Sequence, residues 1–134
     1  MSIVAGAGAP AVETDEHTAD GHRADEHSAA HGGAAPAPIR TPRTLAAAGD
    51  LLRALSAPVR IAIVLQLRES DRCVHNLVDA LGVTQPLISQ HLRVLKAAGV
   101  VHGERKGREV VYSLVDDHLA HIVVDAVEHA EEGR

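Results

Sequence analysis

Residues 73–98 read CVHNLVDALGVTQPLISQHLRVLKAA, and this stretch predicts two short helices joined by a tight turn. The first helix is expected over residues 73–81 and ends at Gly82, a residue that readily adopts the left-handed conformation of helix C-caps. Thr84 is placed to cap the second helix, Pro86 fits its first turn, and the helix should run to residue 98. Two helices arranged in this way are typical of a helix-turn-helix motif.

The flanking segments predict a winged form of this motif. Helices are expected from residue 44 to about Ser56 and over residues 58–67, where Pro58 suits a first turn. The β-prone runs 100–104 and 109–114 surround a basic turn and predict a hairpin. A last helix should start at a cap on Asp116 or Asp117 and reach about Glu131. The fold class is therefore mainly α with a small β-hairpin, a winged helix-turn-helix.

The composition fits one such domain preceded by a tail. The 134 residues include one Tyr and no Phe or Trp, so the core must be built from aliphatic side chains. Residues 1–43 have no helical or strand period and too little apolar surface to offset the entropy of ordering, so we expect a disordered tail. Residues 44–134 should form the domain that binds DNA and dimerises. The tail histidines, interpreted as opportunistic cation ligands, are His17, His22, His27 and His31.

The sequence also indicates the compartment of the protein. A single Cys excludes an intrachain disulfide framework and a zinc site made only of Cys within one chain. No apolar run reaches the ~18 residues needed to cross a bilayer, and the first residues lack the charged and apolar regions of a signal peptide. We therefore expect a cytoplasmic protein with no membrane partner.

The net charge of −5 conceals a basic segment, because residues 84–108 carry a net +4 while residues 116–134 carry −5. On a helical wheel the apolar residues of the fourth helix, Leu87 and Val94 among them, share one arc, which also holds His91 as a hydrogen-bonded core residue. The opposite arc carries amide, hydroxyl and cationic groups suited to base edges and phosphates. Alone, this arc is more simply a solvated face, but the adjacent basic hairpin favours DNA. The expected contacts are Gln85, Ser89, Gln90, Arg93, Lys96, Arg105, Lys106 and Arg108.

The last helix has an apolar stripe that predicts a dimer. Its members are Leu119, Ile122, Val123, Ala126, Val127 and Ala130, which follow a helical period. A domain of about 90 residues has little spare core to cover such a stripe. We expect it to pair with the same helix of a second copy in a two-fold homodimer, and the alternative is packing on its own domain.

Possible metal ligands lie along one edge of this stripe. His118 and His129 are about 20° apart on the wheel but about 16 Å apart along the axis, so one ion cannot bind both within a single helix. Antiparallel pairing across a two-fold axis brings Asp116 and His118 of one chain near His129 and Glu132 of the other. Two imidazoles and two carboxylates suit tetrahedral Zn(II), and Co(II) should mimic it.

Other interpretations of the acidic helix stay open at this stage. His121 and Asp125 form an i, i+4 pair near the same edge and are either auxiliary partners or rival ligands. The acidic and His residues could instead only solubilise an exposed helix, which is our interpretation of Asp117, Glu128 and Glu131. A shell closed by four protein ligands leaves no position for water, and no nucleophile arrangement has supporting context, so we do not expect an enzyme.

The chain resembles the ArsR/SmtB family of metal-responsive transcriptional repressors over about residues 44–132. The resemblance is carried by Ala57-Pro58-Val59-Arg60, Cys73-Val74, Ser89-Gln90-His91-Leu92 and the hairpin, and above all by Asp116-x-His118…His129-x-x-Glu132. Within the family the chain looks most like the mycobacterial SmtB-type zinc sensors. The resemblance implies that the apo dimer binds an imperfect inverted repeat and represses, and that zinc releases it from the DNA.

The resemblance also implies a second metal site on the third helix. Cys73 matches its thiolate, but Asn76 stands where the family has an acidic ligand, so we interpret Cys73 mainly as a small buried residue. Three alternatives to zinc sensing remain. A regulator of the same fold could sense Ni, Co or Cd, or it could sense thiol oxidation through Cys73; less favoured is a zinc-buffering protein, which would not need a basic wing.

Overall fold

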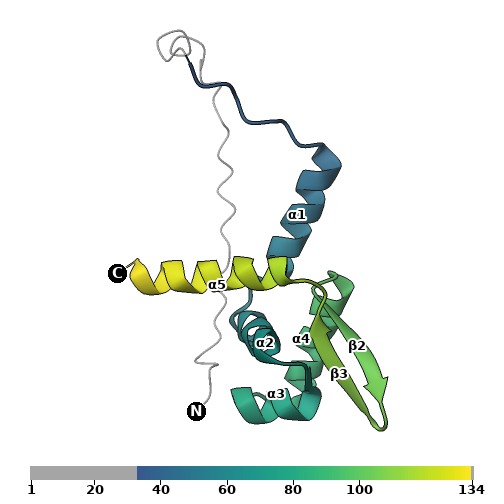
Figure 1. Ribbon diagram of the computed structural model, residues 1–134. Helices are drawn as coiled ribbons and strands as arrows, with labels where there is room; N and C mark the ends of the chain where they lie inside the picture. Colours follow the sequence, from purple (N-terminus) through teal and green to yellow (C-terminus); the bar gives the residue numbers. More distant parts are fainter. Residues whose placement is uncertain (1–32, 134) are drawn as a thin grey trace, which may run out of the picture.

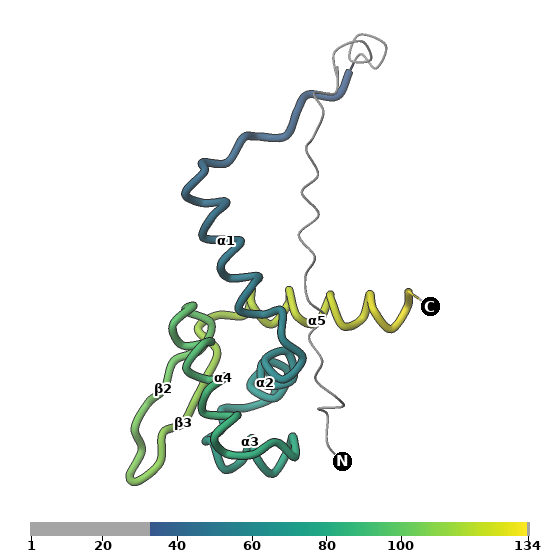
Figure 2. The backbone as a smooth tube through the Cα atoms, turned by 180° about the vertical axis from the view of Figure 1, so that it is seen from behind, coloured from purple at the N-terminus to yellow at the C-terminus, as the bar shows by residue number. Residues whose placement is uncertain are grey.

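Five helices and three strands follow one another in residues 33–133, the part of the chain that the computed structural model describes. The expectations for the tail histidines and most of the tail fall in residues 1–32, outside this range. Figures 1 and 2 show α2, α3 and α4 packed together, the hairpin at one side and α5 lying across α2. The elements are α1 (Pro42–Ala54), α2 (Pro58–Glu69), β1 (Arg72–Cys73), α3 (Val74–Leu81), α4 (Gln85–Ala97), β2 (Val101–Lys106), β3 (Glu109–Leu114) and α5 (Asp117–Glu132).

The helix ends follow the local sequence signals. Gly82 ends α3 with a φ of 65°, as expected for a left-handed cap. Asp116 caps α5, because its Oδ1 accepts the backbone N–H of Leu119 at 3.3 Å. Thr41 caps α1 in the same way, and the helix therefore begins at Pro42, two residues before the expected start. The predicted order of helices and hairpin is confirmed.

The sheet contains one strand that the sequence did not predict. Its order is β1-β3-β2, all antiparallel, and β1 places Cys73 opposite Val111. A strand of two residues is too short to show an alternating pattern, so Arg72 and Cys73 gave no signal. Because Cys73 has the extended backbone of β1, it is the N-cap of α3, and the helix begins at Val74 rather than at Cys73.

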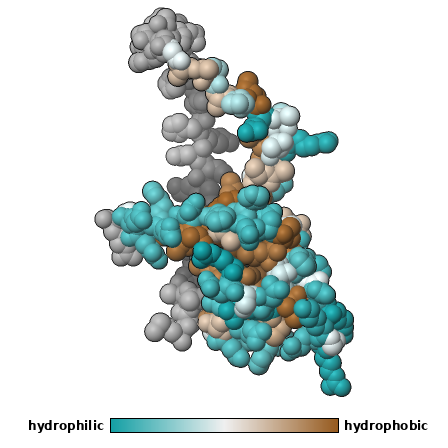
Figure 3. Space-filling model, in the orientation of Figure 1, coloured by the Kyte–Doolittle hydropathy of each residue, from teal (hydrophilic) through white to brown (hydrophobic). Residues whose placement is uncertain are grey.

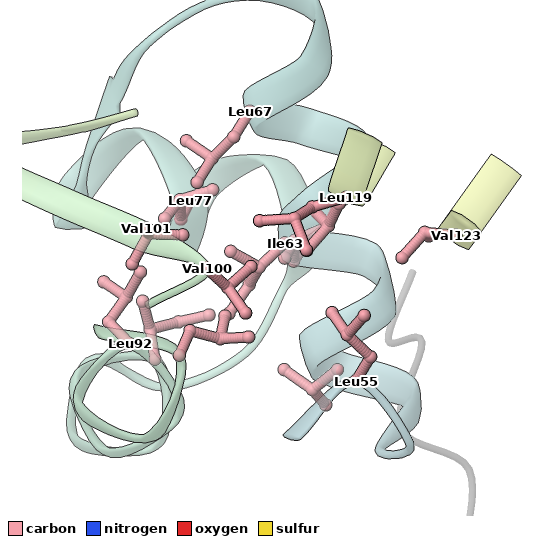
Figure 4. Packing of buried hydrophobic residues seen from close by; sticks show 14 of the residues in the cluster. Leu55, Ile63, Leu67, Leu77, Leu92, Val100, Val101, Leu119 and Val123 are labelled. Carbon is pink, nitrogen blue, oxygen red and sulfur yellow. The ribbon is translucent and has the colours of Figure 1, made fainter. Parts of the chain in front are cut away.

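The core is aliphatic, as the composition required. Figure 4 shows three side chains meeting at the centre of the core: Ile63 of α2, Leu119 of α5, and Val100, which precedes β2. Ile63 and Val100 are fully buried. The apolar arc of α4 is narrower than expected, since Leu87 is 42% and Val94 is 37% exposed. These two positions lie at the edges of the arc, where the wheel alone does not decide between core and solvent. Within residues 33–133 no helix is long and apolar enough to span a bilayer.

Two helices extend away from this body. The first half of α1 and the second half of α5 project from it in both views (Figures 1 and 2). Residues 42–48 of α1 are all exposed, and only its last turns are buried or half-buried. Figure 3 shows hydrophilic side chains along the visible side of α5 and hydrophobic ones where α1 meets the body. Among residues 33–133, the body has its own core, whereas each projecting helix has a surface that these residues leave exposed.

Candidate nucleic-acid interface and metal-binding helix

The exposed face of α4 carries the polar side chains that the sequence singled out. Ile88, Leu92 and Leu95 anchor the opposite face in the core, each at most 1% exposed, and so fix the rotation of the helix. Four of the five candidate DNA contacts on α4 are exposed, and Ser89 is half-buried. The exposed ones are Gln85, Gln90, Arg93 and Lys96.

The wing carries exposed basic side chains at its tip. Arg105, Lys106 and Arg108 are all exposed, and Gly107 makes the turn with a φ of 65°, as two-residue hairpins favour. A pocket of about 270 Å³ separates the wing from the start of α4, and both Arg108 and Gln85 line it. The start of α4 and the wing therefore border the same hollow.

Gly103 lets the wing pack closely on itself. A Cβ atom at this position would lie 2.8 Å from Cγ1 of Val110 and 3.1 Å from Cε1 of Tyr112. Gly103 and Tyr112 are directly paired across β2 and β3. The absence of a side chain at this position thus makes room for the one aromatic ring of the chain.

His91 is the histidine of α4, and it makes the hydrogen bond expected of it without being fully enclosed. Its ring is half-buried, and its Nδ1 lies 3.4 Å from NH1 of Arg60 on α2. Burial and, secondarily, the Arg60 charge lower the pKa of His91 below its usual value. His91 is thus directed toward α2 and away from the exposed polar face of α4.

The first half of the proposed metal site is assembled within one chain. Asp116 Oδ1 lies 3.7 Å from Nδ1 of His118, and the His118 side chain is 91% exposed. Both contacts of the Asp116 carboxylate, the helix cap and the approach to His118, use Oδ1. The cap therefore fixes the carboxylate plane, and both of these contacts leave Oδ2 unused.

The other two candidate ligands lie at the far end of the same helix. His129 and Glu132 are exposed and three residues apart on the last turns of α5. Within residues 33–133, no three His, Cys, Asp or Glu side chains come close enough to hold one ion. The auxiliary candidates His121 and Asp125 are also exposed, four residues apart between the two pairs. Within one chain, the four candidate ligands therefore form two separate pairs at opposite ends of α5.

Cys73, the other auxiliary candidate, has a structural role here. Its thiol is buried at 6% exposure, and Sγ lies 3.1 Å from Oδ1 of Asn76, which also accepts the Cys73 backbone N–H at 3.1 Å. Asn76 therefore completes the cap of α3 with an uncharged side chain. An acidic residue at this position could accept the same hydrogen bond but would add a negative charge. The expected burial of Cys73 is confirmed.

The apolar stripe of α5 divides between two surroundings. Leu119 and Val123 are buried in the core of their own chain, at 6% and 2% exposure, which corrects the expectation that the whole stripe faces a second copy. Ile122 is 39% exposed, and Ala126 and Ala130 are exposed as well. The physical reason is that the first turns of α5 cover α2 and the sheet, whereas the later turns extend beyond them (Figure 1).

A second open apolar surface lies on α1 and was not singled out by the sequence. Leu45 and Leu52 are 58% and 53% exposed and seven residues apart, which places them on one side of the helix. Their spacing was the available signal, but a helix that packs on its own domain gives the same pattern. Within residues 33–133, these two leucines remain largely exposed.

A winged helix-turn-helix body with an exposed polar helix and a basic wing defines a DNA-binding transcriptional regulator. The family described as bacterial regulatory protein, arsR family, matches residues 57–102. The HTH-type transcriptional repressor SmtB of Mycobacterium tuberculosis is 64% identical over 121 residues, which cover 90% of this chain and 87% of the repressor. The chain therefore belongs to the ArsR family.

Other relatives agree with this assignment. The HTH-type transcriptional regulator NmtR of M. tuberculosis is 44% identical over 80 residues, or 60% of this chain and 67% of the regulator. The solution structure of apo-NmtR covers 75% of this chain and 85% of its own, with 38% identity and a TM-score of 0.58. A homodimeric winged helix-turn-helix domain of Mycobacterium bovis shares the fold, with 24% identity, a TM-score of 0.64, and coverage of 75% and 93%.

Proposed function

We propose that this regulator is a zinc-responsive repressor. The apo homodimer binds an inverted-repeat operator through α4 and the wing, and zinc held between two α5 helices lowers its affinity for DNA. The observation that carries the proposal is the 3.7 Å approach of Asp116 to His118 at one end of an exposed helix whose other end presents His129 and Glu132. The relatedness to a repressor named SmtB supports the same interpretation.

The donor set suits zinc. Two imidazole nitrogens and two carboxylate oxygens are ligands that Zn(II) accepts in tetrahedral geometry. Asp116 and His118 of one subunit would hold the ion together with His129 and Glu132 of the partner, since a single helix separates the two pairs by about 16 Å. When bound, the ion supplies positive charge and a fixed link between the two helices.

The open apolar surfaces support the dimer on which this site depends. Ile122 with its neighbouring alanines on α5, and Leu45 with Leu52 on α1, are exposed on the two helices that project from the body. Burial of apolar side chains between copies would stabilise an isologous dimer, with the same residues contributed by both subunits. The two-fold axis then relates two reading helices, as an inverted repeat requires.

The carboxylates explain why an unliganded dimer differs from a liganded one. Residues 116–134 carry a net charge of −5 in each chain, so two antiparallel α5 helices repel each other where Asp116 faces Glu132. When a metal ion neutralises this repulsion, the relative orientation of the two subunits changes. The distance between their α4 helices then departs from the ~34 Å that separates successive major grooves. Such coupling is typically 1–3 kcal/mol, or about 5–150-fold, and DNA must weaken zinc binding by the same factor.

Operator binding in chelator-buffered metal tests this function. The probe is a labelled duplex that the apo protein selects from a randomised library, titrated with Zn, Ni, Co and Cd. We expect tight binding without metal and release by Zn at the lowest free concentration. A protein that selects no duplex is not a DNA-binding regulator, and release that is lost in Cys73→Ser but kept in His129→Ala would point to the thiol instead.

A further inference from the structure

The guanidinium of Arg60 links three helices, α1, α2 and α4. Arg60, in the first turn of α2, donates from Nε to the backbone oxygen of Ala54 at 2.6 Å. Its NH1 lies 3.4 Å from Nδ1 of His91 on α4, at the long end of the hydrogen-bond range. Ala54 is the last residue of α1, so its carbonyl belongs to the end of a helix, where a cation is favourable.

The bridge lies beside a hollow between α1 and α4. Residues 42–48 of α1 are exposed, and a pocket of about 510 Å³ lies between the last turns of α1 and the second half of α4. Arg60, Ala54 and Val94 all line this pocket. The end of α1 also packs on the core through the buried Ala54 and Leu55, and the polar bridge through Arg60 adds a directional link from that end to α4 beside the hollow.

The bridge requires a particular form of His91. An arginine only donates, so Nδ1 must be unprotonated and the ring proton must be on Nε2. The half-buried position and the neighbouring guanidinium both lower the pKa of His91, which favours this neutral form. His91 shares α4 with the exposed Gln90 and Arg93, so its bond to Arg60 adds a polar link from α2 to a helix whose opposite face the core already anchors.

We infer that Arg60 and His91 are a positioning pair that holds the reading helix α4 at a set place relative to the end of α1. The inference rests on the proposed DNA-reading role of α4 and on α1 as part of the dimer surface. In a dimer, α1 is tied to the partner and α4 to the DNA, so this bridge connects the two. Loss of the pair leaves the reading residues intact but lets their helix shift.

Matched variants of His91 separate positioning from general stability. Asn places an oxygen acceptor close to where Nδ1 lies, whereas Leu has similar bulk and no acceptor. We expect His91→Asn to bind the selected duplex within about twofold of wild type and His91→Leu to bind about tenfold more weakly, with the helical circular dichroism of both unchanged. Arg60→Lys offers one ammonium that cannot reach both partners, and adding His91→Leu to it should weaken binding little further.

Arg93→Ala distinguishes failure of this inference from failure of the proposed function. If His91→Leu binds like wild type while Arg93→Ala binds weakly, α4 reads DNA and the pair has no role. If Arg93→Ala also binds like wild type, the reading face itself is wrong. Should His91→Leu not fold, the nitrogen-15 shifts of the wild-type ring decide: a proton on Nε2 supports the bridge, and a proton on Nδ1 overturns it.

Discussion

The helices α4 and α5 are both amphipathic, yet they differ in how much of their apolar face is buried within one chain. Ile88, Leu92 and Leu95 bury α4 along its length, whereas α5 buries Leu119 and Val123 and leaves Ile122 39% exposed. The polar face of α4 is consequently set by a rigid core within one chain. In the second half of α5 only Val127 packs against the core within residues 33–133, and the other residues of that half are exposed.

Under the proposed function, this difference suits separate tasks for the two helices. A reading helix must be placed accurately on DNA, and a core that fixes its rotation serves that purpose. A sensing helix must exist in two arrangements of comparable energy, because an effector can shift an equilibrium only between states it distinguishes. The proposed function thus places recognition on the helix that is buried along its length and metal sensing on the helix that is partly exposed.

The largest expected effect comes from replacing an apolar side chain by Ala on each of the two helices and comparing the losses. Leu92→Ala removes a fully buried side chain and should lower the free energy of unfolding by about 2–5 kcal/mol. Ile122→Ala on α5 should cost about 1 kcal/mol or less in the fold of a single chain but should weaken dimerisation. Urea unfolding and sedimentation velocity measure the two quantities. Equal losses of fold stability would remove the distinction between the helices.

Next in size is the loss of zinc response. His129→Ala and His118→Ala should bind the selected duplex as tightly as wild type, but zinc should no longer weaken that binding by the 5–150-fold typical of such coupling. Glu128→Ala is the matched control, because it removes an exposed carboxylate beside His129 that the proposed site does not use. Anisotropy titrations with and without zinc measure both. Zinc release that persists in His129→Ala contradicts the ligand assignment.

A smaller effect concerns the basic residues of the reading surface. Arg93→Ala or Arg105→Ala should weaken DNA binding and reduce the slope of log affinity against log salt by about 1, because one fewer phosphate contact releases one fewer counterion. Arg68→Ala, at the exposed end of α2, is the control and should leave the slope unchanged. Unchanged slopes for Arg93 and Arg105 would remove both from the interface.

The smallest effect is the pH dependence that His91 contributes. Its pKa is lowered in the folded chain, so between that value and 6.5 the unfolded state binds more protons than the folded state. The free energy of unfolding should therefore fall as pH drops below about 6.5, and it should fall less in His91→Asn. Urea unfolding of both proteins over a pH series measures the difference. Identical pH profiles would show that His91 titrates normally.

The sequence predicted what local chemistry determines. The Asp116 cap, the Gly82 turn and the prolines at helix starts appear where expected, because each depends on a few neighbouring residues. The strand β1 was missed because two residues have no period, and it exists only through its pairing with β3. The caps and turns depend on residues close in sequence, whereas β1 depends on pairing with residues about 40 positions away.

The candidate site shows the same limit. The wheel correctly grouped the apolar residues of α5, but it could not tell Val123, which meets α2 and the core, from Ile122, which meets solvent. The Arg60 bridge was also beyond the sequence, since residues 54, 60 and 91 come together only in the folded chain. Which partner a face meets is decided by tertiary packing, and periodicity carries no information on it.

Mixed dimers test most directly whether one ion is held by two chains. One variant lacks Asp116 and His118, the other lacks His129 and Glu132, each through substitution by Ala, and differently tagged chains confirm that subunits exchange. Neither variant alone should give the visible absorption of tetrahedral Co(II), whereas the mixture should regain one complete site per mixed dimer. If mixing restores no cobalt spectrum although mixed dimers form, the ligands do not come from two α5 helices and the account is wrong.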